Sequence, residues 1–420
     1  MAHFQAADIL LPDLDDYESW AVVACDQYSS NPDYWNGIYE RIKDKPSTLH
    51  LILPEAWLNT EQARIHQSKI RPSMEALLQK ELLKEYPGSY IYVERTLSNG
   101  TIRQGLIGAL DLDSYDYHCP STSAIRATEA TILDRIPPRA LIRQDAILEF
   151  PHILLLQNDV KDHLFQSLAS VKHEMPVVYD FDLMENGGHI TGRLIRGELK
   201  DLTDSWIAAY ESSVEGENPL LYAVGDGNHS LAAAKAIWKY RKEGLSDDQK
   251  QNHPSRYALA ELENLHSEAQ QFEPIHRILK GIDVSKLLQE IPQGDPANSY
   301  PIEWVSGDQK GTIYLDASIS PLPLAVLQKH LDAWLGEFEG DQTQTIDYIH
   351  GEKELEELAQ KPDSIGFFLP AITKDSLFET IQADGSLPRK TFSMGHAHEK
   401  RYYLEGRLLI PKAQDTGKSE

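Results

Sequence analysis

The residues best suited to chemistry lie in one short turn, Gly225-Asp226-Gly227-Asn228-His229-Ser230. An apolar run at 220–224 precedes the turn, and an alanine-rich helical pattern at 231–242 follows it. Gly225 and Gly227 let the backbone turn sharply and approach a ligand closely. A helix that begins inside the turn presents unpaired N–H groups and the positive end of its dipole. The order strand, turn, helix therefore predicts an anion site that suits phosphate.

The polar side chains of the turn add chemistry to this anion site. Asp226 could orient a hydroxyl group, hold a metal ion or serve as a base, and His229 could exchange a proton near neutral pH. Ser230 and Asn228 complete the expected phosphate-binding set. The alternative is an ordinary turn in which Asn228 or Ser230 only caps the helix. The spacing matches neither a P-loop, because no Gly-Lys-Ser/Thr follows, nor a Rossmann turn.

Composition limits the classes of partner. The chain has 40 Lys and Arg against 65 Asp and Glu, a net charge of −25, and the basic residues are scattered. Such a field repels nucleic acid and anionic membranes, whereas a helix N-terminus can still bind a small anionic metabolite locally. Two cysteines, Cys25 and Cys119, exclude a disulfide framework and a structural zinc site. The absence of a long apolar run and of a secretion signal at 1–8 predicts a cytoplasmic protein.

Strands and helices alternate in the pattern that positions the turn. The expected strands are 20–24, 46–54, 89–97, 102–111, 176–182, 189–195, 220–224 and 257–264, and the expected helices are 34–43, 59–85 and 231–242. Asn99-Gly100 and the glycines at 187–188 predict hairpins. After residue 280, helices at 285–290 and 322–338 mix with strands at 311–315 and 364–369.

These patterns predict an α/β or α+β protein with mixed sheets. Residues 1–280 are expected to form the main body that contains the turn, and 281–385 a smaller α+β domain. Residues 386–412 are expected to return to the main body, and the polar end at 413–420 to be disordered. The sequence leaves the oligomeric state open.

Two polar sites outside the turn are further candidates. Asp26 and Tyr28 follow the apolar run at 20–24, where α/β proteins often place functional residues. Asp26 could activate a hydroxyl or bind a metal, although aspartate often only ends a strand. Glu129 lies in a polar cluster, 128–135, at the expected start of a helix. The residues alone favour an exposed helix face, and only the resemblance of the chain to a known family implies a catalytic role for Glu129.

Two histidine-containing segments are also candidates for binding. His276 and Arg277 could supply a cation for phosphate, or could form a partly exposed loop pair. The segment 395–401 holds His396 and His398, but residues two apart face opposite ways on a helix, so metal binding there is disfavoured.

Several of these segments together resemble the bacterial domain-of-unknown-function family numbered 1015. The resemblance rests on the turn and on the segments 24–28, 127–131, 134–135 and 272–277, and it spans most of residues 1–280 with parts of the tail. The turn is also distantly similar to that of the ParB and sulfiredoxin superfamily, which includes a free serine kinase. That resemblance implies a ParB/sulfiredoxin-like core whose turn holds nucleotide phosphates. The position of family members near serine-biosynthesis genes implies serine or phosphoserine as substrate.

The chain departs from the family pattern at two positions. Ser230 stands where the family usually has arginine, which removes a bidentate phosphate donor. Another cation would have to replace it, and Arg277 or Lys235 are the candidates. Asn228 stands where sulfiredoxin has its reactive cysteine, so reduction of sulfinic acid is excluded.

The residues and the resemblance together predict phosphoryl transfer to a small hydroxylated metabolite, with free serine as the first candidate. ATP or ADP would place its phosphates on 225–230 together with Mg²⁺. Asp226 or Asp26 would orient or deprotonate the hydroxyl, and His229 with Arg277 would neutralise the developing charge. The alternatives are a phosphatase that acts on a compound such as phosphoserine and a nucleotide sensor without catalysis.

Overall fold

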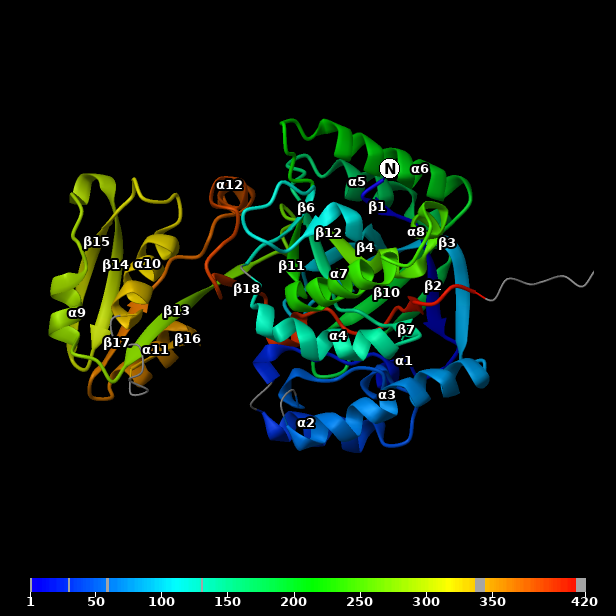
Figure 1. Ribbon diagram of the computed structural model, residues 1–420, viewed down its shortest axis with the longest axis horizontal. Helices are drawn as coiled ribbons and strands as arrows, with labels where there is room; N and C mark the ends of the chain where they lie inside the picture. The colour runs from blue at the N-terminus through cyan, green and yellow to red at the C-terminus, as the bar shows by residue number, and fades with distance from the viewer. Residues whose placement is uncertain (1, 29–30, 58–59, 130, 337–343, 413–420) are drawn as a thin grey trace, which may run out of the picture. The chain divides into compact units, whose positions relative to one another are not determined.

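The computed structural model describes residues 2–28, 31–57, 60–129, 131–336 and 344–412 (Figure 1). The chain forms two compact units: the first comprises 1–127, 131–270 and 396–420, and the second 128–130 and 271–395. The tail at 413–420, expected to be disordered, lies outside the described residues. The second unit differs from the expected 281–385 because the strand β13 (Phe272–Lys280) pairs within its sheet.

Eleven of the described strands form the large sheet of the first unit, in the order β5-β6-β11-β8-β12-β4-β3-β10-β9, with β1 beside β4 and β2 beside β3. Their bounds are β1 (Phe4–Gln5), β2 (Ala7–Pro12), β3 (Leu83–Thr96), β4 (Ile102–Asp111), β5 (Tyr115–Asp116), β6 (Ile125–Ala127), β8 (Leu154–Gln157), β9 (Val177–Asp182), β10 (His189–Ile195), β11 (Tyr222–Asp226) and β12 (Tyr257–Asn264). A separate pair joins β7 (Leu148–Glu149) to β19 (Arg407–Leu408). Parallel and antiparallel neighbours both occur, which confirms the predicted class of mixed sheets.

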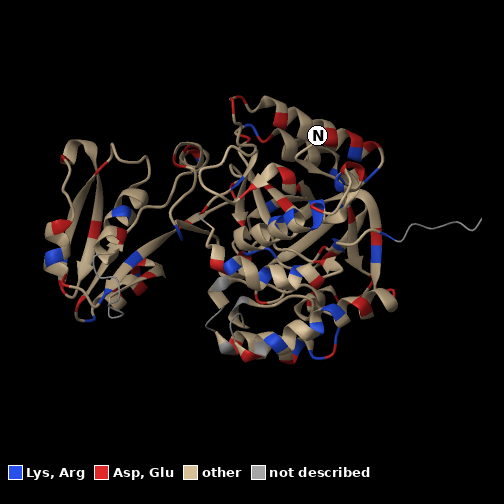
Figure 2. Ribbon diagram, viewed as in Figure 1, with Lys and Arg blue, Asp and Glu red and all other residues tan. Residues whose placement is uncertain are grey.

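Helices cover this sheet on both faces (Figure 1). They are α1 (Tyr17–Trp20), α2 (Pro32–Ile42), α3 (Glu61–Gln79), α4 (Ile136–Asp145), α5 (His163–Val171), α6 (Glu198–Ser213), α7 (Asn228–Lys242) and α8 (Asp247–Asn252). Successive side chains of a strand point to opposite faces of the sheet, and residues 90–93 of β3 follow this alternation. Tyr90 and Tyr92 belong to one hydrophobic core, which includes Trp238 of α7, whereas Ile91 and Val93 belong to the other. Basic and acidic residues are interspersed along the helices (Figure 2).

The second unit is built on an antiparallel sheet in the order β15-β14-β17-β13-β16, with β18 paired to β13. Besides β13 its strands are β14 (Ser299–Ser306), β15 (Gln309–Asp316), β16 (Thr345–His350), β17 (Ser364–Phe368) and β18 (Phe392–Met394), and its helices are α9 (Val284–Glu290), α10 (Pro323–Gly336), α11 (Glu352–Ala359) and α12 (Lys374–Asp384). A small core of Ile278, Val305, Ile349 and Leu355 holds α11 against this sheet. In the described part of the chain, no helix is long and apolar enough to cross a membrane.

Both predicted hairpins are confirmed, as β3 with β4 and β9 with β10. The strand predicted at 20–24 was wrong: α1 ends at Trp20, and Val22 makes only an isolated bridge to Tyr403. The strand predicted at 46–54 was also wrong, because a 3₁₀ turn occupies Thr48–His50. Short apolar runs do not distinguish a strand from other buried backbone. The helix predicted at 59–85 ends at Gln79, and Glu81 adopts a φ of 53° before β3 begins.

Candidate active site

The turn at 225–230 joins the end of β11 to the start of α7, as predicted. β11 pairs with β6 in parallel and with β8 in antiparallel register, where Asp226 lies opposite Leu154. The register shifts between Val224 and Asp226, so Gly225 forms an irregularity in the strand. Such a bulge turns the next side chain away from the regular pleat. The irregularity therefore lies directly before Asp226, the last residue of β11.

Gly227 is the N-cap of α7 and has a φ of 82°, in the left-handed region. A Cβ added there would lie 3.2 Å from the Cα of Ile153 and 3.3 Å from its Cγ1. The backbone angle strongly favours glycine, and the approach of Ile153 leaves little room for a Cβ. Because the cap residue is glycine, neither Asn228 nor Ser230 occupies the cap position.

Replacing Gly227 with alanine is expected to lower the free energy of unfolding by about 1–3 kcal/mol, since a left-handed φ and a close backbone contact are both strained. Gly37 is the matched control. It lies inside α2, and a Cβ added to it would meet nothing within 4 Å. Gly37→Ala should therefore stabilise by about 0.5–1 kcal/mol. Urea unfolding measures the change in the free energy of unfolding for both variants. A change of the same sign in both would contradict the claim that this position favours glycine.

Asp226 is paired with a lysine that sequence reasoning missed. Its Oδ2 lies 3.2 Å from Nζ of Lys400, and its Oδ1 accepts a hydrogen bond of 2.8 Å from the Gly227 N–H. The two side chains are 28% and 13% exposed. Burial alone would raise the pKa of Asp226, but the positive charges of Lys400 and His152 lower it below its ordinary value. Asp226 is therefore ionised at neutral pH.

His152 is the second group that sequence reasoning missed. It precedes β8, and its neighbour Ile153 is the residue that approaches Gly227. Its ring centroid lies 4.9 Å from that of Tyr403. The segment at 152–153 thus runs along the turn and adds an imidazole to the surroundings of Asp226.

The remaining residues of the turn begin α7. Asn228, His229 and Ser230 are half-buried and form the first turn of a helix of 15 residues. This first turn carries no acidic residue, and its N–H groups point toward the same end of the helix as the Asp226–Lys400 pair. A carboxylate, an ammonium group and a helix N-terminus therefore meet in one place. Such a set can bind a phosphate and orient a hydroxyl group.

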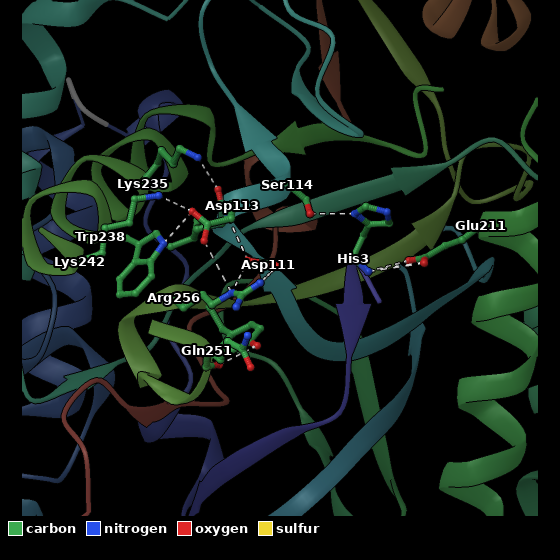
Figure 3. Close-up of polar contacts among 12 residues, drawn as sticks. His3, Asp111, Asp113, Ser114, Glu211, Lys235, Trp238, Lys242, Gln251 and Arg256 are labelled. Atoms are coloured by element: carbon green, nitrogen blue, oxygen red, sulfur yellow. Dashed lines mark hydrogen bonds and ion pairs between the residues drawn. The ribbon is translucent and has the colours of Figure 1, made fainter. Parts of the chain in front are cut away.

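Side chains of α7 fix the helix to the 3₁₀ turn at Leu112–Ser114, which follows β4 (Figure 3). Lys235 Nζ donates to the Leu112 carbonyl at 2.7 Å. Trp238 Nε1 donates to Asp113 Oδ1 at 3.0 Å, and Lys242 Nζ lies 2.7 Å from the same oxygen. The ammonium group of Lys235 is therefore hydrogen-bonded to the Leu112 carbonyl. The structure thus offers Lys400 rather than Lys235 as the cation of the turn.

An ion pair between Asp111 and Arg256 supports the turn that these side chains contact. Arg256 donates to both carboxylate oxygens of Asp111, from Nε at 3.0 Å and from Nη2 at 2.6 Å. Asp111 and Arg256 are 3% and 7% exposed. Asp111 also accepts a hydrogen bond of 2.9 Å from the N–H of Asp113. The pair therefore shapes the turn that receives Trp238 and Lys242.

The other predicted site residues lie in different surroundings. Asp26 lies in a 3₁₀ turn at Asp26–Tyr28 of the first unit. Glu129 belongs to the second unit, where it bridges Leu387. His276 and Arg277 also belong to the second unit, on β13. A catalytic role for Asp26 or Glu129 stays a prediction.

His276 and Arg277 are engaged within the second unit. His276 Nδ1 accepts a hydrogen bond of 3.1 Å from the Leu369 N–H, and burial lowers its pKa. Arg277 is fully buried, and its Nε donates to Gln328 at 2.8 Å. Its Nη2 donates to the carbonyls of Arg389 and Lys390 at 2.9 and 3.0 Å. These bonds account for both side chains structurally, and the phosphate role predicted for them is untested.

Buried charged residues form a cluster. They come from β4, from β12 and from the segment that follows Lys400. Arg103 Nε is 3.0 Å from Glu263, and Arg401 lies 3.1 Å from Glu261 and 2.9 Å from Glu405. Burial and the neighbouring Glu261 carboxylate raise the pKa of Glu263 to about 8, although Arg103 opposes the shift. Glu263 is therefore largely protonated at neutral pH.

This shift predicts a stability that depends on pH. An acid whose pKa is raised on folding contributes stability below its unfolded pKa, and loses it as the pH rises toward the folded value of about 8. Glu263→Gln cannot ionise. The free energies of unfolding of the variant and the wild type should be equal near pH 5. As the pH rises toward 8, the variant should become more stable than the wild type by up to about 1.4 kcal/mol per pH unit.

Urea unfolding of both proteins at a series of pH values measures this difference, because all other titrating groups are common to both. A variant less stable than the wild type by about 3–5 kcal/mol at pH 7–8 would contradict the prediction. That result would mean an ionised Glu263 paired with Arg103.

Ligands for a metal ion are sparse at the turn. Among residues the structure describes, no group of three or more His, Cys, Asp or Glu side chains could hold a metal ion. The rings of His396 and His398 are stacked at 5.7 Å. A site for Mg²⁺ at the turn would therefore have one carboxylate, Asp226, and would need ligand oxygens from elsewhere.

The family follows from the sequence match. The profile of the family described as "Protein of unknown function (DUF1015)" matches residues 9–405. This chain belongs to the DUF1015 family. The match confirms the resemblance seen in the turn and in the segments around it. No curated protein matches the sequence.

Solved structures also show similarity to this DUF1015 protein. A free serine kinase in complex with AMP matches with a TM-score of 0.38 and 13% identity, over 70% of this chain and 90% of that one. A conserved hypothetical protein from Pyrococcus furiosus matches with a TM-score of 0.35 and 11% identity, over 72% and 94%. SbnI with a C-terminal truncation, from Staphylococcus aureus, matches with 0.33 and 11%, over 72% and 82%. The predicted likeness to a free serine kinase is thus found, at scores too low to carry an argument.

Proposed function

We propose that this protein transfers a phosphoryl group between a nucleotide and a small hydroxylated metabolite at the turn before α7. The observation that carries the proposal is the contact of 3.2 Å between Asp226 and Lys400 at that turn. A carboxylate held ionised beside an ammonium group and a helix N-terminus is what phosphoryl transfer needs in one place.

Each group has a defined part. The N–H groups at the start of α7 bind a phosphate, and Lys400 neutralises its charge. His229 donates to a phosphoryl oxygen. The lowered pKa of Asp226 makes it a weak base, so its part is to orient the attacking hydroxyl rather than to remove its proton early.

The donor set is compatible with Mg²⁺ and a nucleotide. Mg²⁺ in such enzymes is held by one or two carboxylates together with phosphate oxygens, and Asp226 fits the protein share of that set. When bound, the ion would neutralise phosphate charge. The nucleotide would be ATP or ADP, with its phosphates toward 225–230. Free serine is the acceptor to test first, following the resemblance of the turn to that of free serine kinases.

A thermal-shift screen tests the proposal. The ligands are AMP, ADP, ATP, serine and phosphoserine, each with Mg²⁺, on the wild type and on Asp226→Ala and His229→Ala. ADP or ATP should raise the Tm of the wild type and leave that of both variants unchanged. Lys310→Met, which removes an exposed pair with Glu356, is the control and should respond like the wild type.

Each of the other outcomes of the screen would replace the proposal or end it. A shift with phosphoserine alone would replace the proposal with a phosphatase. A nucleotide shift without turnover of any hydroxylated metabolite would replace it with a nucleotide sensor. The absence of any shift would mean that the turn is structural, and the proposal would be abandoned.

A further inference from the structure

Backbone contacts from two arginines hold the segment that carries Lys400. Lys400 follows a 3₁₀ turn at Ala397–Glu399. Arg95 Nη1 donates to the carbonyls of Lys400 and Glu399 at 2.8 and 3.1 Å, and its Nη2 donates to the carbonyl of His398 at 2.5 Å. Arg103 Nη1 donates to the carbonyl of Glu399 at 2.7 Å. Three consecutive carbonyls are thus fixed by two guanidinium groups.

The two arginines come from adjacent strands and face each other. Arg95 of β3 and Arg103 of β4 are direct cross-strand partners. They are 2% and 8% exposed. Like charges placed opposite each other on a sheet are destabilising, and burial makes the repulsion stronger. Burial, with the charge of Arg103 beside it, lowers the pKa of Arg95 to about 9.

Two apolar residues would remove the repulsion between the strands, but they would leave the carbonyls at 398–400 without these donors. What the pair achieves is geometric. A planar guanidinium group binds two or three carbonyl oxygens in a fixed direction, which a lysine ammonium cannot do. Arg95 also donates to the Gly187 carbonyl at 2.8 Å, and its guanidinium lies 5.0 Å from the Tyr402 ring centroid. The contact of 3.0 Å between Arg103 Nε and Glu263 Oε1 orients the second guanidinium.

We infer that Arg95 and Arg103 are positioning residues, which fix the backbone at 398–400 so that the Lys400 ammonium group lies against Asp226. The inference rests on the proposed function for its purpose, since the placed ammonium group is the one that would meet the phosphate. The placement itself is a separate claim and has its own measurement.

The variants are Arg95→Lys and Arg103→Lys, which keep the charge and lose the planar fork. Arg407→Lys is the matched control. Arg407 is also buried and donates to backbone carbonyls, those of Tyr257 at 2.6 Å and Pro254 at 2.8 Å. Circular dichroism and Tm establish that each variant folds.

The first readout is the rate at which acetic anhydride acetylates Lys400, followed by mass spectrometry. The paired, largely buried amine should react slowly in the wild type and in Arg407→Lys. It should react about tenfold faster in Arg103→Lys and Arg95→Lys, and also in Asp226→Asn, which removes the partner directly. If either arginine variant fails to fold, the other decides.

The second readout is the Kd for ADP, which should rise about tenfold in the two positioning variants and stay unchanged in Arg407→Lys. Unchanged acetylation of Lys400 in a folded Arg103→Lys or Arg95→Lys protein would overturn the inference. If the wild type binds no nucleotide, the proposed function fails, and the acetylation rates still decide the placement of Lys400.

Discussion

Lys400→Met is expected to weaken the binding of ADP by about a hundredfold and to leave the protein folded. The ammonium group lies 3.2 Å from Asp226 at the start of α7. In a partly buried site, one charge-assisted contact to a phosphate is worth about 1.5–3 kcal/mol, which corresponds to roughly 10–150-fold in Kd. Without Lys400 the Asp226 carboxylate would also repel the phosphate, which places the expected loss near the upper end of that range.

Isothermal titration with ADP and Mg²⁺ measures the change. Lys310→Met should bind as the wild type does, because its partner Glu356 lies on the surface of the second unit. The Tm of Lys400→Met should fall, because the Asp226 carboxylate is left without its partner in a largely buried site, and circular dichroism establishes that the variant is folded at the temperature of the titration. A Kd that is unchanged or lower in Lys400→Met would contradict the account. It would mean that Lys400 serves only to neutralise Asp226.

Asp111→Ala should lower the free energy of unfolding by about 3–5 kcal/mol, the range for removing one partner of a buried ion pair. The variant leaves the Arg256 guanidinium buried without the two oxygens that it contacts at 3.0 and 2.6 Å. It also removes the acceptor for the N–H of Asp113. Asp113 in turn receives Trp238 and Lys242 of α7 (Figure 3). The loss should therefore loosen the helix that carries the turn.

Urea unfolding compares this variant with Asp201→Ala. Asp201 is 77% exposed and pairs with Lys200 at 3.1 Å, so its loss should stay below about 1 kcal/mol. Equal, small losses in both variants would contradict a structural role for the Asp111–Arg256 pair. A large loss in Asp111→Ala with unchanged ADP affinity of the folded fraction would separate stability from function.

The sequence predicted the parts of the site that are local. The turn at 225–230 is recognisable because an apolar strand, two glycines and a helical pattern follow one another without a break. Both hairpins were predictable for the same reason, since glycine-containing turns stood between alternating runs. In contrast, the apolar runs at 20–24 and 46–54 carried no periodicity strong enough to exclude irregular backbone.

Lys400 could not be predicted because its role depends on tertiary contacts. The segment 395–401 stands out in the sequence for its histidines, whereas the side chain that contacts Asp226 is the lysine that follows them. Its position depends on Arg95 and Arg103, which are remote in sequence. Ser230 in place of arginine predicts the need for another cation, but the candidate Arg277 is hydrogen-bonded within the second unit. Residue type and proximity in sequence do not reveal which arginine is already engaged.

The most direct test of the central claim follows a labelled phosphoryl group. Purified protein would be incubated with Mg²⁺, serine and ADP or ATP that carries the label on its terminal phosphate, and the products separated. The account predicts labelled phosphoserine with the wild type, and at least about a hundredfold less with Asp226→Asn, in which the hydroxyl-orienting carboxylate is gone. Equal transfer by the wild type and Asp226→Asn, or release of phosphate from phosphoserine without any nucleotide requirement, would contradict it.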